Sequence, residues 1–420
     1  MTEFSVRAEW EPLSAVRVHT PGLELWSGSV DPGPNLFEGH VPPDRARAEH
    51  ERIAATLADA GVTVHQLADD LATAGVLDDL VRESLSVRTD EGDGSADLDG
   101  ICSTFDAHEK LQLALANVTI ERHGVAEGFD AAGEASTEPG GVPVGGRPAT
   151  SLRIDRPISN IYFQRDTTIV GDRGPILCEM YEPVRRPEVP IVREAWEGIG
   201  AEIHYEMDDE PVEGGEFIPA GEFALLGVSA DLDGEEHVIR TSYAAGERLM
   251  DDGAIGYDEV GLVRAPLEAD RRLRAEHGTN SRVMHLLGWF NIAAEGLAVL
   301  DADLARAAEV DVYTTNGDGY AYDRSTSTLE YVRDEHGFDV IAVSPDERWP
   351  TNFLALDDGV VVPLYEPDAE GNYRPEHNPT IEILKEHGVT VLPDGEGLPR
   401  GALTDGAGGI HCMTTPLSRG

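Results

Sequence analysis

The pattern of apolar residues along the chain repeats one unit, a predicted helix followed by a predicted short strand. In each unit apolar residues recur with the helical period, a glycine ends the helix, and a β-branched segment follows. Glycine is favoured there because it adopts the left-handed conformation without steric cost. The stops are Gly61, Gly200, Gly337 and Gly388. The predicted units are HERIAATLADAGVTVHQL (50–67), VREAWEGIGAEIHYE (192–206), YVRDEHGFDVIAV (331–343), TIEILKEHGVTVLPD (380–394) and a looser copy, AAGERLMDDGAIGYDEVGLV (244–263).

Apolar stretches around Asp-Gly pairs predict strand hairpins between these units. EFALLGVSA (222–230) and HVIRTSY (237–243) flank one such turn, and FLALDDGVVVPLY (353–365) contains another. Strand pairs therefore alternate with single helices, which indicates an α/β fold built from β-β-α-β units. Doubly wound α/β proteins also contain helix–glycine–strand units, so this pattern alone leaves the architecture open.

Residues 76–150 break the pattern and predict a separate region. DDLVRESL (78–85) and FDAHEKLQLALANVTIERHG (105–124) have helical spacing, whereas 88–100 and 131–148 are acidic or rich in glycine and predict flexible loops. We expect a first unit over 1–75, a small helical insertion with flexible joints over 76–150, and the remaining units over 151–420.

The charge excludes several classes of partner. The 420 residues carry a formal net charge of −47, from 79 acidic and 32 basic residues, and only Lys110 and Lys385 are lysines. Such a surface repels nucleic acid and anionic membranes. Because molar salt shortens the Debye length to about 3 Å, we expect a protein adapted to high salt. With no long apolar run and no secretory leader pattern, we expect a cytoplasmic protein.

The candidate nucleophile is Cys412, one of three cysteines, in the glycine-rich GGIHCMTTPL (408–417). Asp166, Glu213 and His285 each interrupt an apolar stretch or adjoin glycines. Taken singly, a lone cysteine is more often inert packing, and such polar groups more often only form hydrogen bonds. Together they suit one task, since carboxylates bind a guanidinium, a thiolate attacks its carbon and a histidine moves protons. The sequence contains no CxxC pair, so it does not suggest a thiolate metal site, and we expect no cofactor.

The chain resembles the arginine deiminases of the guanidino-group modifying superfamily. The matching stretches, in family order, are EWEPLSAVRVHTPGLEL, SNIYFQRD, EGGEF, VMHL and GGIHCMTTPLSR. The resemblance implies a five-bladed propeller of β-β-α-β units, of the pentein type, with a small helical insertion. It also implies a hydrolase that converts L-arginine to L-citrulline and ammonia, with a small-molecule substrate. The sequence is compatible with a homo-oligomer but does not reveal the oligomeric state.

The resemblance further implies roles for seven residues. Cys412 would form a covalent amidino-thioether, and His285 would protonate the departing ammonia and then activate water. Asp166 would bind the guanidinium, with Glu213 assisting. The residues expected at the amino-acid end of the substrate are Asn160, Arg185 and, as a less certain match, Arg240.

Three positions depart from the family pattern: Leu287 and Glu216 stand where members have aspartate, and Ala407 where bacterial members often have a basic residue. Leu287 removes a second guanidinium carboxylate, and we expect the longer Glu216 to reach into that gap. The departures leave other functions open: an amidinotransferase, a hydrolase of a modified arginine, or a guanidine-binding protein without activity.

Overall fold

The computed structural model describes residues 4–89, 92–93, 95–123, 149–317, 319–406 and 408–420. The glycine-rich stretch 131–148 and Ala407 therefore lie outside the described residues.

One topology occurs five times in the described part of the chain. Two strands pair antiparallel, and a third strand, reached through a helix, joins the second one in parallel. The sheets are β25 (Thr415–Arg419), β1 (Leu13–Val18) and β2 (Thr63–Gln66); β7 (Thr168–Gly171), β8 (Gly174–Leu177) and β9 (Tyr205–Glu206); β10 (Phe217–Ala220), β11 (Phe223–Val228) and β14 (Glu259–Arg264); β15 (Phe290–Ala294), β16 (Leu297–Leu300) and β19 (Asp339–Ala342); β20 (Leu354–Asp357), β21 (Val360–Val362) and β23 (Thr390–Val391).

Four of the five helices that precede the parallel strands end at the glycine that the sequence predicts. Gly61, Gly200, Gly337 and Gly388 have φ of 90°, 78°, 72° and 83°, in the region that a side chain disfavours. The preceding helices are α2 (Pro43–Asp59), α7 (Glu188–Gly198), α8 (Tyr243–Asp251), α11 (Thr328–Glu330) with its π-helical extension Tyr331–Glu335, and α12 (Pro379–Glu386).

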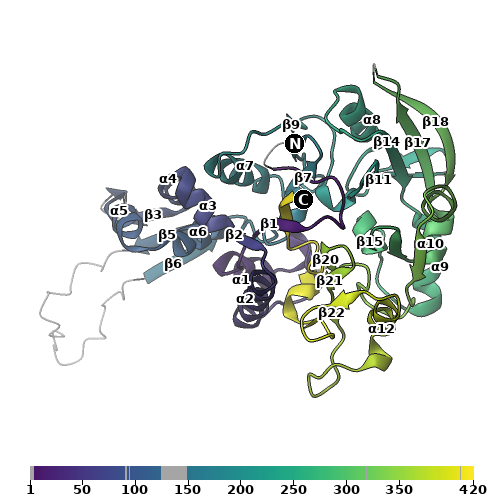
Figure 1. Ribbon diagram of the computed structural model, residues 1–420. Coiled ribbons are helices and arrows are strands. Elements are labelled where there is room, and N and C mark those ends of the chain that lie inside the picture. Colours follow the sequence, from purple (N-terminus) through teal and green to yellow (C-terminus); the bar gives the residue numbers. More distant parts are fainter. Residues whose placement is uncertain (1–3, 90–91, 94, 124–148, 318, 407) are drawn as a thin grey trace, which may run out of the picture.

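The first sheet is completed by the last strand of the chain. β25 pairs antiparallel with β1, with Leu13 opposite Arg419 and Arg17 opposite Thr415. Figure 1 shows the two ends of the chain close together beside this sheet. The pairing brings Cys412, three residues before β25, next to the segment that precedes β7, where the Arg165 backbone N–H donates to the Cys412 carbonyl at 3.1 Å.

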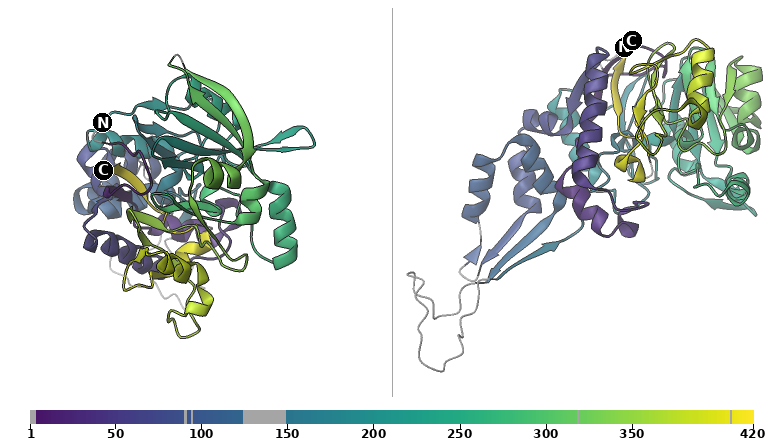
Figure 2. Two further views of the ribbon diagram at one scale, coloured as in Figure 1. Left: turned by 45° about the vertical axis from the view of Figure 1, so that its right-hand side comes forward. Right: turned by 90° about the horizontal axis from the view of Figure 1, so that it is seen from below.

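Helices α3 to α6 and strands β3 to β6 lie between the first and second sheets along the chain and project to one side of the molecule (Figures 1 and 2). The strands form a separate sheet of order β4-β3-β5-β6. The elements are α3 (Leu67–Ala74), α4 (Leu77–Ser84), β3 (Ser86–Thr89), β4 (Gly92–Asp93), α5 (Ser95–Thr104), α6 (Ala107–Ala116), β5 (Val118–His123) and β6 (Ala149–Ile154).

Two predictions in this region are wrong. The stretch 88–100, expected to be a loop, contains β4 and the start of α5, because Leu98, Ile101 and Cys102 supply an apolar side that packs in a small core. The helix expected over 105–124 ends at Ala116. Asn117 has φ of 49°, and the β-branched VTI that follows forms β5.

The predicted hairpins are partly confirmed. β20 and β21 pair around Gly359. Around Asp233 and Gly234, however, the hairpin consists of the short strands β12 (Ala230–Leu232) and β13 (Glu235–His237), so the strand expected over 237–243 is wrong. β11 instead pairs with β10 and β14, because all six of its residues are buried and their backbone N–H and C=O groups need partners on both edges.

Further helices of the described fold are α1 (Leu23–Val30), α9 (Leu267–His277) and α10 (Ala302–Ala307). The strands β17 (Glu309–Thr315) and β18 (Tyr320–Ser327) extend the third sheet beyond β14, and β22 (Leu364–Tyr365) pairs in parallel with β24 (Leu398–Pro399). Within the described residues, no helix combines the length and apolar character that crossing a membrane requires.

Candidate active site

A polar or nucleophilic side chain occurs at the same place in each of the five repeated sheets. Each lies in the short segment that leads into the first strand of its sheet, so the repeated topology places all of them at equivalent ends. These residues are Asp166 before β7, Glu213 before β10, His285 before β15, Asn352 before β20 and Cys412 before β25.

Most of the predicted site residues meet at one cavity. Cys412, His285, Asp166, Asn160, Arg185 and Arg240 line it, together with Leu36, Phe163, Met284 and Gly406. Glu213 lies behind His285 and is fully buried. The structure therefore brings together a thiol, an imidazole, a carboxylate and two guanidinium groups.

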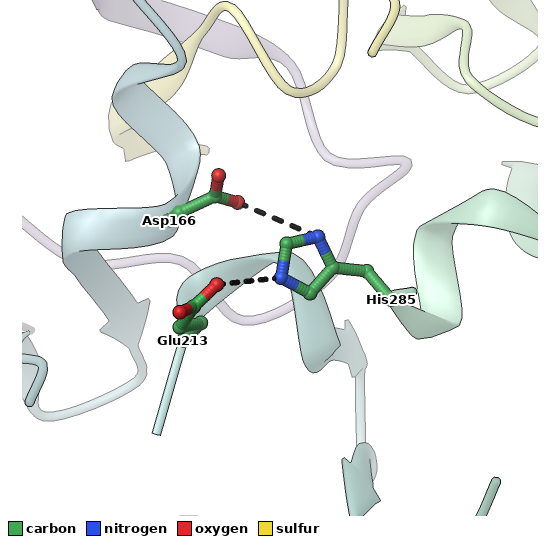
Figure 3. A group of neighbouring side chains, drawn as sticks. All are labelled: Asp166, Glu213 and His285. Carbon is green, nitrogen blue, oxygen red and sulfur yellow. Dashed lines mark hydrogen bonds and ion pairs between the residues drawn. The ribbon is translucent and has the colours of Figure 1, made fainter. Parts of the chain in front are cut away.

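His285 lies between two carboxylates (Figure 3). Its Nε2 is 2.8 Å from Glu213 Oε2, and its Nδ1 is 3.8 Å from Asp166 Oδ1. Burial lowers the pKa of His285, but the negative charges of Asp166 and Glu213 outweigh burial and raise this pKa above its ordinary value. His285 is therefore arranged to carry a proton.

Asp166 has one oxygen occupied and one available. Its Oδ2 accepts from Arg185 Nη1 at 2.5 Å, and among the described residues its buried Oδ1 has no hydrogen-bond partner. Burial raises the pKa of Asp166, but the positive charges of His285 and Arg185 outweigh burial. The net pKa lies below the ordinary value, so the group is a carboxylate. A buried carboxylate oxygen without a donor is costly unless a ligand supplies one.

Gly215 keeps the space between these groups open. A Cβ placed there would lie 2.7 Å from His285 Nδ1 and 2.8 Å from Asp166 Oδ1. The second glycine of the EGG stretch is therefore required by close approach.

The Cys412 thiol is buried at the cavity, with 6% of the residue exposed. Burial raises its pKa to about 11, and the nearby charge of Asp166 adds to this effect. Asn352 opposes it by donating from Nδ2 to Sγ at 3.0 Å. The thiol is thus largely protonated at neutral pH.

The residues expected at the amino-acid end of a substrate are held by ion pairs and hydrogen bonds. Arg185 also bonds Glu188, from Nη2 to Oε2 at 2.8 Å. Arg240 Nη1 donates to Glu182 Oε1 at 2.9 Å. Asn160 Nδ2 donates to the Asn35 carbonyl at 2.8 Å. Their side chains meet at the cavity with Leu36, so this side of it is polar, and its two guanidinium groups are paired with carboxylates.

Glu216 and Leu287 lie behind the lining of the cavity. The Oε2 of Glu216 accepts from the backbone N–H of Leu286 at 2.6 Å, next to His285, and burial raises the pKa of Glu216 to about 7. Leu287 packs in the hydrophobic core with Trp289 and Phe290. The side chain at 287 is therefore a core residue, and the gap expected beside the guanidinium is not found at this position.

Asn352 is the functional candidate that sequence reasoning missed. It sits in RWPTNFLALDD with no flanking glycines, and nothing local distinguishes it from an ordinary asparagine before a strand. The available signal was its place before the first strand of a repeated unit, which becomes readable once the five units are aligned.

Asp166, Glu213 and His285 also form a group suited to a cation. One ligand atom from each lies within 4.8 Å of the others, and all three residues are buried. Its two carboxylates flank His285, and of the two Asp166 lines the cavity.

A family model for arginine deiminase matches residues 35–419 of this chain. An arginine deiminase from Halobacterium salinarum is 33% identical over 482 aligned residues, covering 100% of this chain and 97% of that protein. One from Rhodococcus erythropolis is 26% identical, covering 99% of this chain and 97% of that protein.

Two solved structures share the fold at low sequence identity. The N-terminal domain of ArgZ, an arginine dihydrolase from cyanobacteria, superposes with a TM-score of 0.53 at 11% identity, covering 96% of this chain and 97% of that one. DDAH from Pseudomonas aeruginosa gives a TM-score of 0.51 at 12% identity, covering 96% and 98%. The match of the family model over most of the chain, with the full-length likeness to the Halobacterium enzyme, establishes that the chain belongs to the arginine deiminase family.

Proposed function

We propose that this protein hydrolyses L-arginine to L-citrulline and ammonia through a covalent intermediate on Cys412. The observation that carries the proposal is the Oδ1 of Asp166, which accepts no hydrogen bond from the part of the chain that the structure describes and is buried at a cavity lined also by Cys412 and His285. A guanidinium N–H satisfies this oxygen, and its positive charge suits the two carboxylates beside His285.

Substrate binding activates the nucleophile in this proposal. The pKa of Cys412 is raised by burial and by the negative charge of Asp166. A guanidinium bound to Asp166 offsets that charge and places a cation near the sulfur, so both effects favour the thiolate. The thiol therefore ionises when arginine is present.

The reaction then proceeds in two halves. The thiol releases its proton to solvent, and the thiolate attacks the guanidinium carbon. The bond from this carbon to a terminal nitrogen breaks, and protonated His285 donates its proton to that nitrogen, which leaves as ammonia. Neutral His285 next takes a proton from water, which attacks the amidino-thioether. The C–S bond breaks as the carbonyl of citrulline forms, the proton lost from the added hydroxyl restores the thiol, and citrulline leaves. Glu213 holds the imidazole through Nε2 and stabilises its charged form.

Arg185, Arg240 and Asn160 are proposed to bind the carboxylate and amino groups of arginine. Arg185 is already neutralised by Asp166 and Glu188, so it shares its donors with the substrate rather than offering a free charge. Arg240 is paired with Glu182 at the more exposed side.

For the architecture, we propose that the five sheets form a closed five-bladed propeller in which residues 76–150 are an insertion between the first and second blades. The repeated topology and the pairing of β25 with β1, which joins the last unit to the first, support this arrangement.

Incubation with L-arginine in potassium chloride, followed by assays for citrulline and ammonia, tests the activity. One citrulline and one ammonia per arginine are expected. Ornithine as the product indicates a dihydrolase, and a guanidino product formed only with an added amine indicates an amidinotransferase. A higher kcat/KM for a methylated arginine than for arginine indicates a hydrolase of modified arginine.

A further inference from the structure

Asn352 occupies, in the fifth repeated sheet, the place that the other four sheets give to Asp166, Glu213, His285 and Cys412. Those four residues carry the proposed reaction, and Asn352 is 2% exposed among them. The repeated topology therefore directs a side chain in the segment before β20 toward the same site as the other four.

The contacts of Asn352 fix which end of its amide faces the sulfur. Its Oδ1 is 3.0 Å from the backbone nitrogen of His411 and 3.3 Å from that of Cys412. Both nitrogens are donors, so the atom facing them must be the acceptor oxygen. The remaining amide nitrogen, Nδ2, then points its N–H at Cys412 Sγ, 3.0 Å away.

The backbone around Asn352 is held on both sides. Asn291, a buried residue of β15, donates from Nδ2 to the carbonyls of Thr351 at 2.7 Å and Phe353 at 2.9 Å. The hydroxyl of Thr351 donates to the Leu287 carbonyl at 3.0 Å. Asn352 is therefore positioned before any substrate arrives.

Gly409 makes room for this side chain. A Cβ at Gly409 would lie 2.7 Å from Asn352 Oδ1 and 2.9 Å from its Cβ. The second glycine before Cys412 is thus explained by Asn352.

We propose that Asn352 is a catalytic residue, which donates a hydrogen bond to the Cys412 thiolate and holds the sulfur in position for attack on the guanidinium carbon. This inference rests on the proposed function, since it takes Cys412 as the nucleophile. The amide donates when the sulfur is an anion and again when the C–S bond breaks. Its hydrogen bond to Sγ also lowers the pKa of the thiol against the effect of burial.

The test measures the sulfur without substrate. The alkylation rate of Cys412 by iodoacetamide is followed against pH, by mass spectrometry of the peptide that contains it. Asn352→Ala is expected to raise the apparent pKa of the thiol and slow alkylation about tenfold at a fixed pH below it, and to lower kcat by about a hundredfold. Asn352→Asp keeps an acceptor for both backbone N–H groups but points a second oxygen at the sulfur, and is expected to raise that pKa further.

A purely structural role predicts a different order. It makes Asn352→Asp behave like the wild type, because the bonds to His411 and Cys412 remain. Asn378→Ala is the matched control: this asparagine is also buried and bridges backbone groups at Glu366 and Arg374. It is expected to lower the unfolding temperature but leave the alkylation profile unchanged.

The results separate this inference from the proposed function. A thiol pKa and kcat in Asn352→Asp that match the wild type overturn the role of Asn352, whether or not Asn352→Ala folds. The alkylation assay uses no arginine, so its result does not depend on turnover. A Cys412→Ser variant that retains full activity overturns the proposed function instead.

Discussion

Glu213 Oε2 lies 2.8 Å from Nε2 of His285, and 5% or less of either side chain is exposed. The negative charge of Glu213 is one of the reasons that the pKa of His285 is raised. In this pair the buried carboxylate of Glu213 therefore stabilises the proton on His285.

Replacing Glu213 with Gln is expected to shift the pH dependence of the enzyme downward. The pKa of His285 is higher in the folded than in the unfolded protein. Protonated His285 therefore stabilises the fold at pH values below the unfolded-state pKa, and this stabilisation is lost as pH rises through the folded-state pKa. Without the Glu213 charge the loss comes at lower pH. The alkaline limb of the kcat profile should move the same way, and kcat should fall by orders of magnitude. An unchanged alkaline limb would show that His285 is not the acid.

Asp166→Asn should lower kcat/KM by orders of magnitude, because the guanidinium loses its buried counter-charge. Breaking such a pair costs roughly 3–5 kcal/mol. The measurement is steady-state kinetics with arginine. Asp78→Asn is the control, since Asp78 forms a half-exposed pair with Lys110 and should leave the rate unchanged. Near-normal kinetics in Asp166→Asn would place the guanidinium elsewhere.

Cys412→Ser should abolish turnover while leaving the fold intact, because a hydroxyl is a far weaker nucleophile than a thiolate at neutral pH. Rapid quenching of the wild type followed by mass spectrometry should find an arginine-derived adduct on Cys412. The buried Cys102 and Cys178 serve as internal controls, and an adduct on either one instead would refute the assignment.

Glu216→Ala should lower kcat by at least about tenfold, or roughly 1.4 kcal/mol. The reason is indirect: the Leu286 N–H loses its acceptor, and the backbone that carries His285 is then less firmly held. Glu222→Ala, at an exposed acidic position nearby, is the control. If KM alone rises in Glu216→Ala, Glu216 acts on binding and not on His285.

The unfolding temperature should rise with potassium chloride into the molar range. The formal net charge of −47 repels itself in dilute buffer, and molar salt shortens the Debye length to about 3 Å. Thermal unfolding followed by circular dichroism at increasing salt is the measurement. A flat profile would contradict the proposed adaptation to salt.

The sequence predicted the repeated units well because their signals are local. The stop at Gly200 depends only on its own helix and conformation, and the structure confirms it. VTIERH was misread because its helical neighbour extends an amphipathic pattern, whereas pairing with β3 and β6 decides its conformation. The β-branched VTI is a local signal for a strand, but the two partner strands are not visible in the local pattern.

The site shows the same division. Cys412, His285 and Asp166 could be named because each is a chemically distinctive residue in an apolar or glycine-rich setting. Asn352 could not, since its importance comes from a contact with a residue 60 positions away. Leu287 was misplaced for a related reason: its position in sequence indicated the cavity, but the 3-10 turn Leu286–Gly288 directs it into the core.

The antiparallel pairing of β25 with β1 has a consequence for how the protein folds. Joining segments about 400 residues apart carries a loop-closure entropy on the order of 5 kcal/mol, which nearby contacts do not offset until much of the chain is ordered. The local helix–strand units can form earlier, so the strand that follows the nucleophile should dock late. During refolding, activity should therefore return after the helical signal, and the partly folded chain should be inert toward arginine although most of its structure is already present.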